Sequence, residues 1–210
     1  MDKPVIIIGA GGLGKATLDI FKSNQVIVYG FLDSDENLYG TKIQDVTVLG
    51  GFKDDIFLKL IGPKCEAFLA LDDPQSRKEL GHVILEDRKV MPVNAIHRSA
   101  FIEESVRISH GSFINSGVII GSGAVLGSFC LFHSGVIIDY QVSIGDYAQI
   151  GAGSVLNSNA QIGKSVLIGS GATIAAGVKI GDKAQIAPGS VVIGEVKKGQ
   201  TVFGNPAQPV

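Results

Sequence analysis

The sequence predicts a chain in two parts: an α/β domain of the Rossmann-like βαβ type, followed by an all-β parallel β-helix. Two observations support this fold class. A large apolar residue recurs at every sixth position between residues 96 and 192, and an apolar run at residues 5–8 leads directly into a glycine-rich turn. We therefore expect a small domain at residues 1–90 and a β-helix domain at residues 91–210.

The six-residue repeat predicts the β-helix. Its period is neither the 3.6 residues of an α-helix nor the alternation of a long strand, and it fits a solenoid in which three short strands and three turns complete one coil. The residue two positions before each anchor, from Ala100 onward, is small or β-branched. A glycine often follows the anchor, where a turn needs positive φ or close packing. A β-sandwich would break this register, because its loops vary in length. The anchors are Ile96, Ile102, Ile108, Ile114, Ile120, Leu126, Phe132, Ile138, Ile144, Ile150, Leu156, Ile162, Ile168, Ile174, Ile180, Ile186 and Val192.

The first domain begins with the pattern of a nucleotide-binding βαβ unit. The strand at residues 5–8 leads into the turn GAGGLG at residues 9–14, a helix at 15–23, a strand at 26–32 and then Asp33. Such a turn lets the backbone approach a phosphate at a helix N-terminus, and Asp33 stands where a ribose-binding carboxylate is expected. The alternative is that the glycines only form a tight turn.

The rest of the first domain is expected to be short. We predict one further strand at residues 67–71 and helices at 54–60 and 74–84. Two or three βα units are small for NAD, so the pattern favours a nucleotide-linked substrate.

Composition excludes several other classes of protein. Apolar residues make up 45% of the 210 residues and charged residues 18%, which argues against disorder. A net charge of −2 gives no argument for a nucleic-acid or membrane partner. Cys65 and Cys130 form no CxxC unit, which favours buried thiols in a reducing compartment, and the first residues do not resemble a signal peptide. We therefore expect a cytoplasmic protein. We also expect no metal site, because His97 and His133 lie two coils, roughly 10 Å, apart and cannot share one metal ion.

Four segments together indicate a family. They are the turn at residues 5–14, the strand end Phe31-Leu32-Asp33, residues 93–97 at the entry to the coils, and residues 202–207, which contain Gly204-Asn205-Pro206-Ala207. Over nearly the whole chain, the sequence resembles the sialic acid O-acetyltransferase family of left-handed β-helix sugar acetyltransferases. This family includes bacterial N-acetyltransferases acting on UDP-4-amino sugars and on GDP-perosamine.

The resemblance implies a left-handed β-helix with a C-terminal cap and a homotrimer with active sites between subunits. It implies acetyl-CoA in the groove between neighbouring β-helices and a nucleotide-linked amino sugar on the first domain. By position, the sugar nucleotide would contact Gly11, Gly12, Leu13 and Asp33. Acetyl-CoA would contact Gln149, Gly169, Ser170, Ala187 and Pro188, largely through backbone groups.

The chain departs from the family at its catalytic histidines. Tyr140 stands where the family has its general base, Gln141 where the base has an acidic neighbour, Gln149 where a second histidine lies near the acetyl group, and Leu13 where the turn often carries a histidine. Among the remaining imidazoles, His133 is the best candidate for a base or substrate contact, and the alternative is a surface turn histidine. Tyr140 could donate a hydrogen bond. Asp139 could act as a base through water, or it could only shape the turn.

The expected activity is transfer of an acetyl group from acetyl-CoA to an amino group, or a hydroxyl, of a nucleotide-linked sugar in bacterial surface-glycan biosynthesis. Such an enzyme could also work by alignment alone, without a general base. Two alternatives stay open. One is a catalytically weakened or non-catalytic trimeric relative that binds sugar nucleotides, which the missing histidines suggest. The other is an acyltransferase for an unrelated amine or alcohol.

Overall fold

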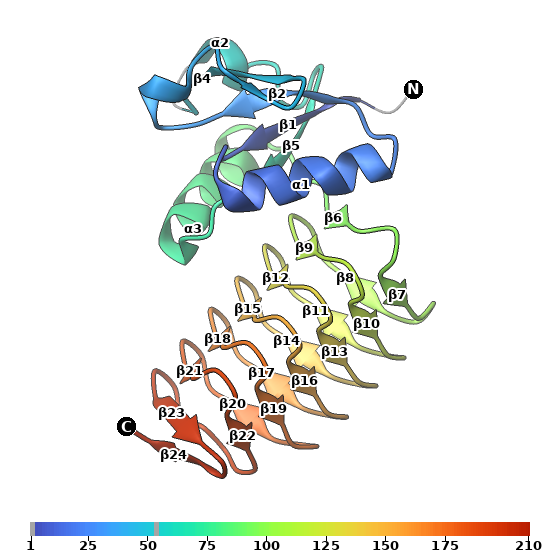
Figure 1. The fold of residues 1–210 in the computed structure, drawn as a ribbon, viewed down its shortest axis with the longest axis vertical. Coiled ribbons are helices and arrows are strands. Elements are labelled where there is room, and N and C mark those ends of the chain that lie inside the picture. The colour runs from blue at the N-terminus through green and yellow to red at the C-terminus, as the bar shows by residue number, and fades with distance from the viewer. Residues whose placement is uncertain (1–2, 53–54) are drawn as a thin grey trace. The chain divides into compact units, whose positions relative to one another are not determined.

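The computed structural model describes residues 3–52 and 55–210 (Figure 1). It divides into two compact units, Met1–Arg98 and Ser99–Val210. Among the described residues, no helix is long and apolar enough to cross a membrane.

The first unit is built on one five-stranded sheet. The strand order is β3-β4-β2-β1-β5, and all neighbours are parallel except β3 and β4. The carboxyl ends of β1, β2, β4 and β5 therefore meet at one edge of the sheet. The strands are β1 (Val5–Ile8), β2 (Val28–Leu32), β3 (Lys42–Ile43), β4 (Val46–Gly50) and β5 (Glu66–Leu69), and β6 (Ala95–Ile96) follows later in the chain.

Helices accompany this sheet. They are α1 (Gly12–Ser23), α2 (Asp55–Leu58) and α3 (Pro74–His82), with a 3₁₀ turn at Glu36–Leu38 and a π-helical turn at Val83–Asp87. The helix predicted at 15–23 begins three residues earlier, at Gly12. Its N-cap is Gly11, which has an extended backbone and precedes the first helical turn. The predicted start of a helix at Asp54 lies outside the described residues.

Helix α1 packs one apolar face onto the sheet. Its buried residues recur at helical spacing, and the ring of Phe21 meets that of Phe68 on β5 edge-on, with centroids 5.9 Å apart. The strands beneath are buried on both faces, which explains why β1 reads as an unbroken apolar run.

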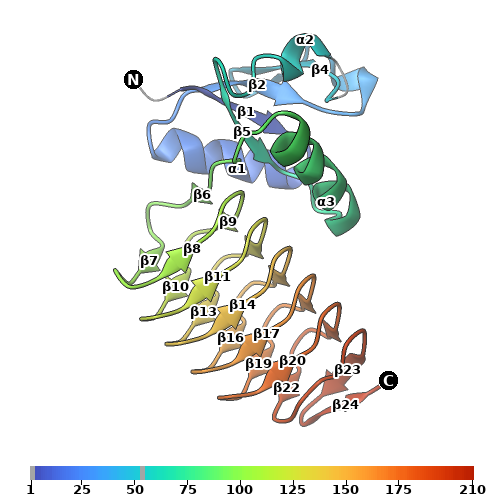
Figure 2. The same cartoon turned by 180° about the vertical axis from the view of Figure 1, so that it is seen from behind.

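The second unit is a parallel β-helix with three walls (Figures 1 and 2). Paired residues lie eighteen apart, as in Ile119 with Ile137, so the predicted coil length is confirmed. Wall 1 comprises β7 (Phe101–Ile102), β10 (Ile119–Ile120), β13 (Ile137–Ile138), β16 (Val155–Leu156), β19 (Thr173–Ile174) and β22 (Val191–Val192). Wall 2 comprises β8 (Arg107–Ile108), β11 (Val125–Leu126), β14 (Ser143–Ile144), β17 (Gln161–Ile162) and β20 (Lys179–Ile180). Wall 3 contains β9 (Phe113–Ile114), β12 (Leu131–Phe132), β15 (Gln149–Ile150), β18 (Leu167–Ile168), β21 (Gln185–Ile186), β23 (Thr201–Gly204) and β24 (Ala207–Pro209).

The anchors fill the interior of the coils. Those from Ile114 to Val192 are buried, whereas Ile102 and Ile108 are only half-buried. Strands β7 and β8 are the first strands of walls 1 and 2. At the other end, β24 folds back antiparallel to β23, so a hairpin closes wall 3.

The structure decides between the two reasons offered for glycine after an anchor. A Cβ on Gly151 would lie 2.4 Å from the backbone nitrogen of Ser170 in the next coil, so close packing requires glycine there. Positive φ occurs instead at the third residue after an anchor, as at Gly135, Gln141 and Tyr147.

Candidate active site

The glycine-rich turn after β1 contains glycines of two kinds. Gly9 has φ +112°, and a Cβ on it would lie 2.3 Å from the Ala70 carbonyl oxygen. A Cβ on Gly14 would lie 2.0 Å from the carbonyl oxygen of Gly9. Gly11 and Gly12, by contrast, have open space within 4 Å of the position of a Cβ. Gly9 and Gly14 are thus required by packing, whereas Gly11 and Gly12 leave room for a ligand at the start of α1.

The other two residues expected to bind the sugar nucleotide have distinct environments. The Leu13 side chain is buried in the core, so only its backbone can face a ligand. Asp33, at the end of β2, accepts a hydrogen bond from the Ala10 N–H through Oδ2 at 2.6 Å and one from the Asp35 N–H through Oδ1 at 2.9 Å. The carboxylate thereby joins two strand ends, and its remaining lone pairs can accept from a ribose hydroxyl.

Wall 3 and the corner that follows it bring together most of the residues expected to contact acetyl-CoA. The His133 Nε2 atom lies 3.5 Å from the Gln149 Nε2 atom, and the His133 ring lies 6.2 Å from that of Phe113. The turns that follow β18 and β21 stack beneath this corner, because the register is eighteen residues. Those turns carry Gly169, Ser170, Ala187 and Pro188.

Asp139 and Tyr140 lie at a different corner, the one that follows wall 1. The Asp139 carboxylate accepts a hydrogen bond from the Tyr140 N–H at 2.8 Å, and 49% of Tyr140 is exposed. Strand β13 separates this corner from His133. A single chain therefore does not bring His133 together with Tyr140.

The corner after wall 2 holds a stack of rings. The His110 ring meets Phe129 edge-on at 5.2 Å, and Phe129 stacks on Tyr147 at 5.1 Å with an interplanar angle of 6°. Burial lowers the pKa of His110, and the Asp146 carboxylate only partly offsets this. The Nε2 atom of His110 is buried without a hydrogen-bonding partner in the described part of the chain.

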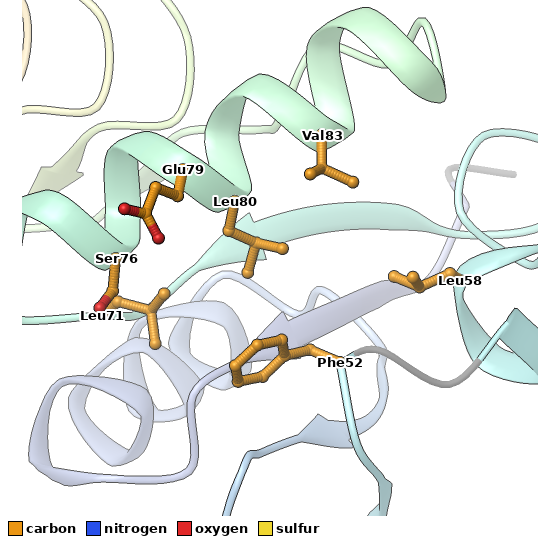
Figure 3. A pocket seen from close by; sticks show the side chains of 7 residues that line it. All are labelled: Phe52, Leu58, Leu71, Ser76, Glu79, Leu80 and Val83. Carbon is orange, nitrogen blue, oxygen red and sulfur yellow. The ribbon is translucent and has the colours of Figure 1, made fainter.

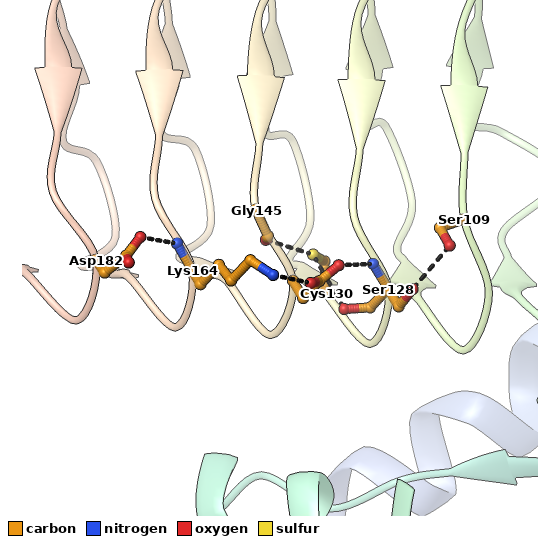
Figure 4. Close-up of polar contacts among 7 residues, drawn as sticks. Ser109, Ser128, Cys130, Gly145, Lys164 and Asp182 are labelled. Atoms are coloured by element: carbon orange, nitrogen blue, oxygen red, sulfur yellow. Dashed lines mark hydrogen bonds and ion pairs between the residues drawn. The ribbon is translucent and has the colours of Figure 1, made fainter. Parts of the chain in front are cut away.

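A ladder of polar contacts runs along the same corner (Figure 4). The hydroxyls of Ser109 and Ser128 lie 2.7 Å apart, the Ser128 N–H donates to Asp146 at 3.0 Å, and Lys164 forms an ion pair with Asp146 at 2.9 Å. The Lys164 N–H in turn donates to Asp182 at 2.8 Å. Burial alone would raise the pKa of Asp146, but the Ser128 N–H and the Lys164 ammonium together lower it. The ladder ties successive coils together.

The contact between His133 and Gln149 is one that inspection of the sequence missed. The two residues are sixteen positions apart, which is not the coil period. The eighteen-residue register nevertheless sets Gln149 beside Leu131, two residues from His133, and that was the available signal. Within residues 3–52 and 55–210, no group of three or more His, Cys, Asp or Glu side chains is placed to hold a metal ion.

Comparison with known families matches both units. The PglD N-terminal domain matches residues 4–84, and the bacterial transferase hexapeptide (six repeats) matches residues 159–194. No curated protein sequence matches the chain significantly.

Solved structures share the fold over the full length of the chain. A histidine-to-alanine variant of GDP-perosamine N-acetyltransferase from Caulobacter crescentus, in complex with CoA and GDP-perosamine, is 28% identical, with a TM-score of 0.91 over 99% of this chain and 96% of that one. The acetyltransferase domain of PglB from Neisseria gonorrhoeae, in complex with acetyl coenzyme A, is 22% identical, with a TM-score of 0.90 over 100% of both chains. WeeI from Acinetobacter baumannii is 23% identical, with a TM-score of 0.79 over 99% of both. These matches confirm the resemblance to sugar acetyltransferases and the left-handed β-helix.

The two kinds of glycine predict different mutational effects. Gly14→Ala should lower the melting temperature by several degrees or prevent folding, because its Cβ would overlap the Gly9 carbonyl. Gly11→Ala is the matched control and should change stability by less than about 1 kcal/mol, since its φ of −73° suits alanine. Thermal unfolding followed by circular dichroism measures both, and equal losses would contradict the assignment.

Burial of His110 predicts a loss of stability in mild acid. Above the ordinary histidine pKa of about 6.5 the imidazole is neutral in both states. Below it the unfolded chain takes up a proton first, because burial lowers the pKa of the folded group. The free energy of unfolding should therefore fall as the pH drops from about 6.5 through the folded pKa. Urea titrations across this range should show a smaller fall for His110→Gln than for the wild type. His82→Gln is the control, because it removes an exposed imidazole. If the free energy of unfolding of His110→Gln falls with pH as steeply as that of the wild type, burial of His110 is not the cause.

Proposed function

We propose that this chain is an acetyl-CoA-dependent acetyltransferase that acts on an amino group, or a hydroxyl, of a nucleotide-linked sugar in bacterial surface-glycan biosynthesis in the cytoplasm. One observation carries the proposal. Over 99% of its length, the chain superposes on a GDP-perosamine N-acetyltransferase whose structure holds CoA and GDP-perosamine. The two enzymes share both units in the same order, and a nucleotide-linked amino sugar is accordingly the expected acceptor.

The chemistry divides between the corner after wall 3 and the corner after wall 1. Acetyl transfer needs the acceptor aligned with the thioester, a proton removed from the nucleophile and a donor for the oxyanion. In this proposal Gln149, Gly169, Ser170, Ala187 and Pro188 hold acetyl-CoA along wall 3 and its corner. His133 lies beside Gln149, and we assign it as the imidazole that faces the thioester. It removes the proton from the attacking amine.

The first unit supplies the acceptor. Gly11, Gly12 and the Leu13 backbone take the phosphates at the start of α1, where open space and a helix N-terminus favour an anion. Asp33 takes a ribose hydroxyl with the lone pairs that its bonds to Ala10 and Asp35 leave available.

Asp139 and Tyr140 reach the reaction from a second subunit in this proposal. The Tyr140 hydroxyl donates a hydrogen bond to the acceptor, and Asp139 is the alternative base to His133, acting through water. The proposed oligomer is a homotrimer with active sites between subunits. This arrangement accounts for the separation of His133 from Tyr140 within one chain, because each would belong to a different half of the site.

Wall 1 supports a partner subunit. Its outward residues form an aligned column that is apolar except for one threonine, whereas wall 2 carries mostly polar residues at the same positions. Large exposed apolar columns usually mark contact surfaces. Wall 1 also lies between the His133 corner and the Tyr140 corner, so a subunit that covers it meets both. The column consists of Phe101, Ile119, Ile137, Val155, Thr173 and Val191.

Turnover tests the proposed activity. The wild type should release CoA from acetyl-CoA in the presence of an amino-sugar nucleotide, and His133→Ala should lower kcat about 10²- to 10⁴-fold, because the base is lost. Spectrophotometric thiol release measures both, with His82→Ala as the imidazole control. Absence of CoA release with every GDP- and UDP-linked amino sugar would favour the non-catalytic alternative. An unchanged kcat in His133→Ala would instead mean that Asp139 acts as the base or that alignment of the substrates alone supports the reaction.

The mass of the protein in solution tests the subunit contact. Ile137→Lys places a charge in the centre of the wall 1 column and should convert the trimer to smaller species, because an unpaired charge is costly in an apolar contact. Gln161→Lys on wall 2 is the matched control. Size-exclusion chromatography with light scattering distinguishes the two, and a trimeric Ile137→Lys protein would contradict wall 1 as the contact.

A further inference from the structure

We infer that a cavity beside α3 in the first unit binds the nucleotide's base, and that Glu79 makes the site selective for guanine. The inference rests on the proposed function, since it concerns the nucleotide of that substrate. It adds a base-recognition site and a specificity residue to the phosphate and ribose contacts described above.

The cavity has a volume of about 510 Å³ and lies among α2, α3 and the turns that follow β4 and β5 (Figure 3). This volume falls in the range of small-molecule sites. The flat faces of a nucleobase need apolar or aromatic surfaces on either side. The cavity provides them through Phe52, Leu58, Leu71, Leu80 and Val83.

The position of the cavity suits the base of a nucleotide held at the glycine-rich turn. The Leu71 side chain lies 3.2 Å from the position that a Cβ would take on Gly9. Phe52 also lines a second cavity, of about 270 Å³, together with Ser34, the residue after Asp33. Moreover, β1 pairs with β2 on one side and with β5 on the other, and ligands bind at such a switch point, beyond the carboxyl ends of the strands.

Among the described residues, the polar side chains that line the cavity all lie on α3. Ser76 and Glu79 line the cavity one turn apart, and Figure 3 shows both on the same stretch of this helix. The Gln75 amide donates to Glu79 Oε1 at 2.6 Å, which orients the carboxylate and leaves one acceptor site on Oε1 and both on Oε2 available. An ionised carboxylate only accepts hydrogen bonds.

Guanine is the base whose edge matches a carboxylate. Its N1–H and N2–H groups are adjacent donors, which two carboxylate oxygens accept together. Uracil offers a single N–H between two carbonyl oxygens, which a carboxylate repels. Adenine and cytosine each set an acceptor nitrogen beside their amino group. A pair of matched hydrogen bonds discriminates between bases by about 10- to 100-fold.

Calorimetric titration of the full chain with GDP, UDP and ADP tests the inference. We expect GDP to bind at least about tenfold more tightly than UDP or ADP. Glu79→Gln should weaken GDP binding about 10- to 100-fold, because the amide presents a donor to a donor, and should not weaken UDP binding, because it removes the repulsion between the carboxylate and the uracil oxygens. Phe52→Ala should weaken all three nucleotides.

Glu36→Gln is the matched control, because Glu36 lines the smaller cavity. It should leave the preference for GDP unchanged. The inference is overturned if GDP and UDP bind equally to the wild type, if Glu79→Gln has no effect, or if Glu36→Gln removes the preference instead. These outcomes differ from failure of the proposed function, which would show as absence of CoA release in the turnover assay whatever nucleotide binds.

Discussion

Hydrogen bonds between successive coils govern the second unit. The Ile119 N–H donates to the Val136 carbonyl at 2.9 Å, and the Ile137 N–H donates to the Ser154 carbonyl at 2.9 Å, so each coil is bonded to the next with a constant offset. One inserted residue would turn every later side chain to the opposite face. The constant offset also creates columns, in which residues with the same place in the coil stack along a wall or a corner. Every functional feature of the unit follows from what these columns contain.

Wall 1, wall 2 with its corner, and the corner after wall 3 differ in the chemistry of their side chains, and the difference separates their roles. Wall 1 is apolar outside as well as inside, wall 2 is mostly polar outside, and its corner carries the ladder that links Ser128, Asp146 and Lys164. The corner after wall 3 combines an imidazole with backbone turns that need glycine for close packing. In the proposed function, this distribution assigns one face to a second subunit, one to solvent and one to a long cofactor.

In the first unit, packing and binding are assigned to different residues of one short turn. Gly9 and Gly14 contact backbone atoms of the fold itself, and Asp33 holds the turn through the Ala10 N–H. The open positions Gly11 and Gly12 are therefore presented by a rigid frame. If the proposed function holds, an anion site preorganised in this way loses little entropy when its ligand binds.

The sequence by itself determined the β-helix, its coil length and the βαβ start, because each of these depends on local periodicity and turn chemistry. It also specified that Tyr140 occupies the corner where the family resemblance implies a histidine, since an unbroken repeat leaves no freedom in register. Tertiary structure alone decided that His133 meets Gln149 and not Tyr140, that Ile102 and Ile108 in the first coil are only half-buried, and that positive φ occurs at the third residue after an anchor. It also produced the cavity that Phe52, Leu71 and Glu79 share. The contacts and the cavity arise where segments distant in the chain stack against one another, and a repeat read along the chain gives the register of the coils but not which side chains then turn toward each other.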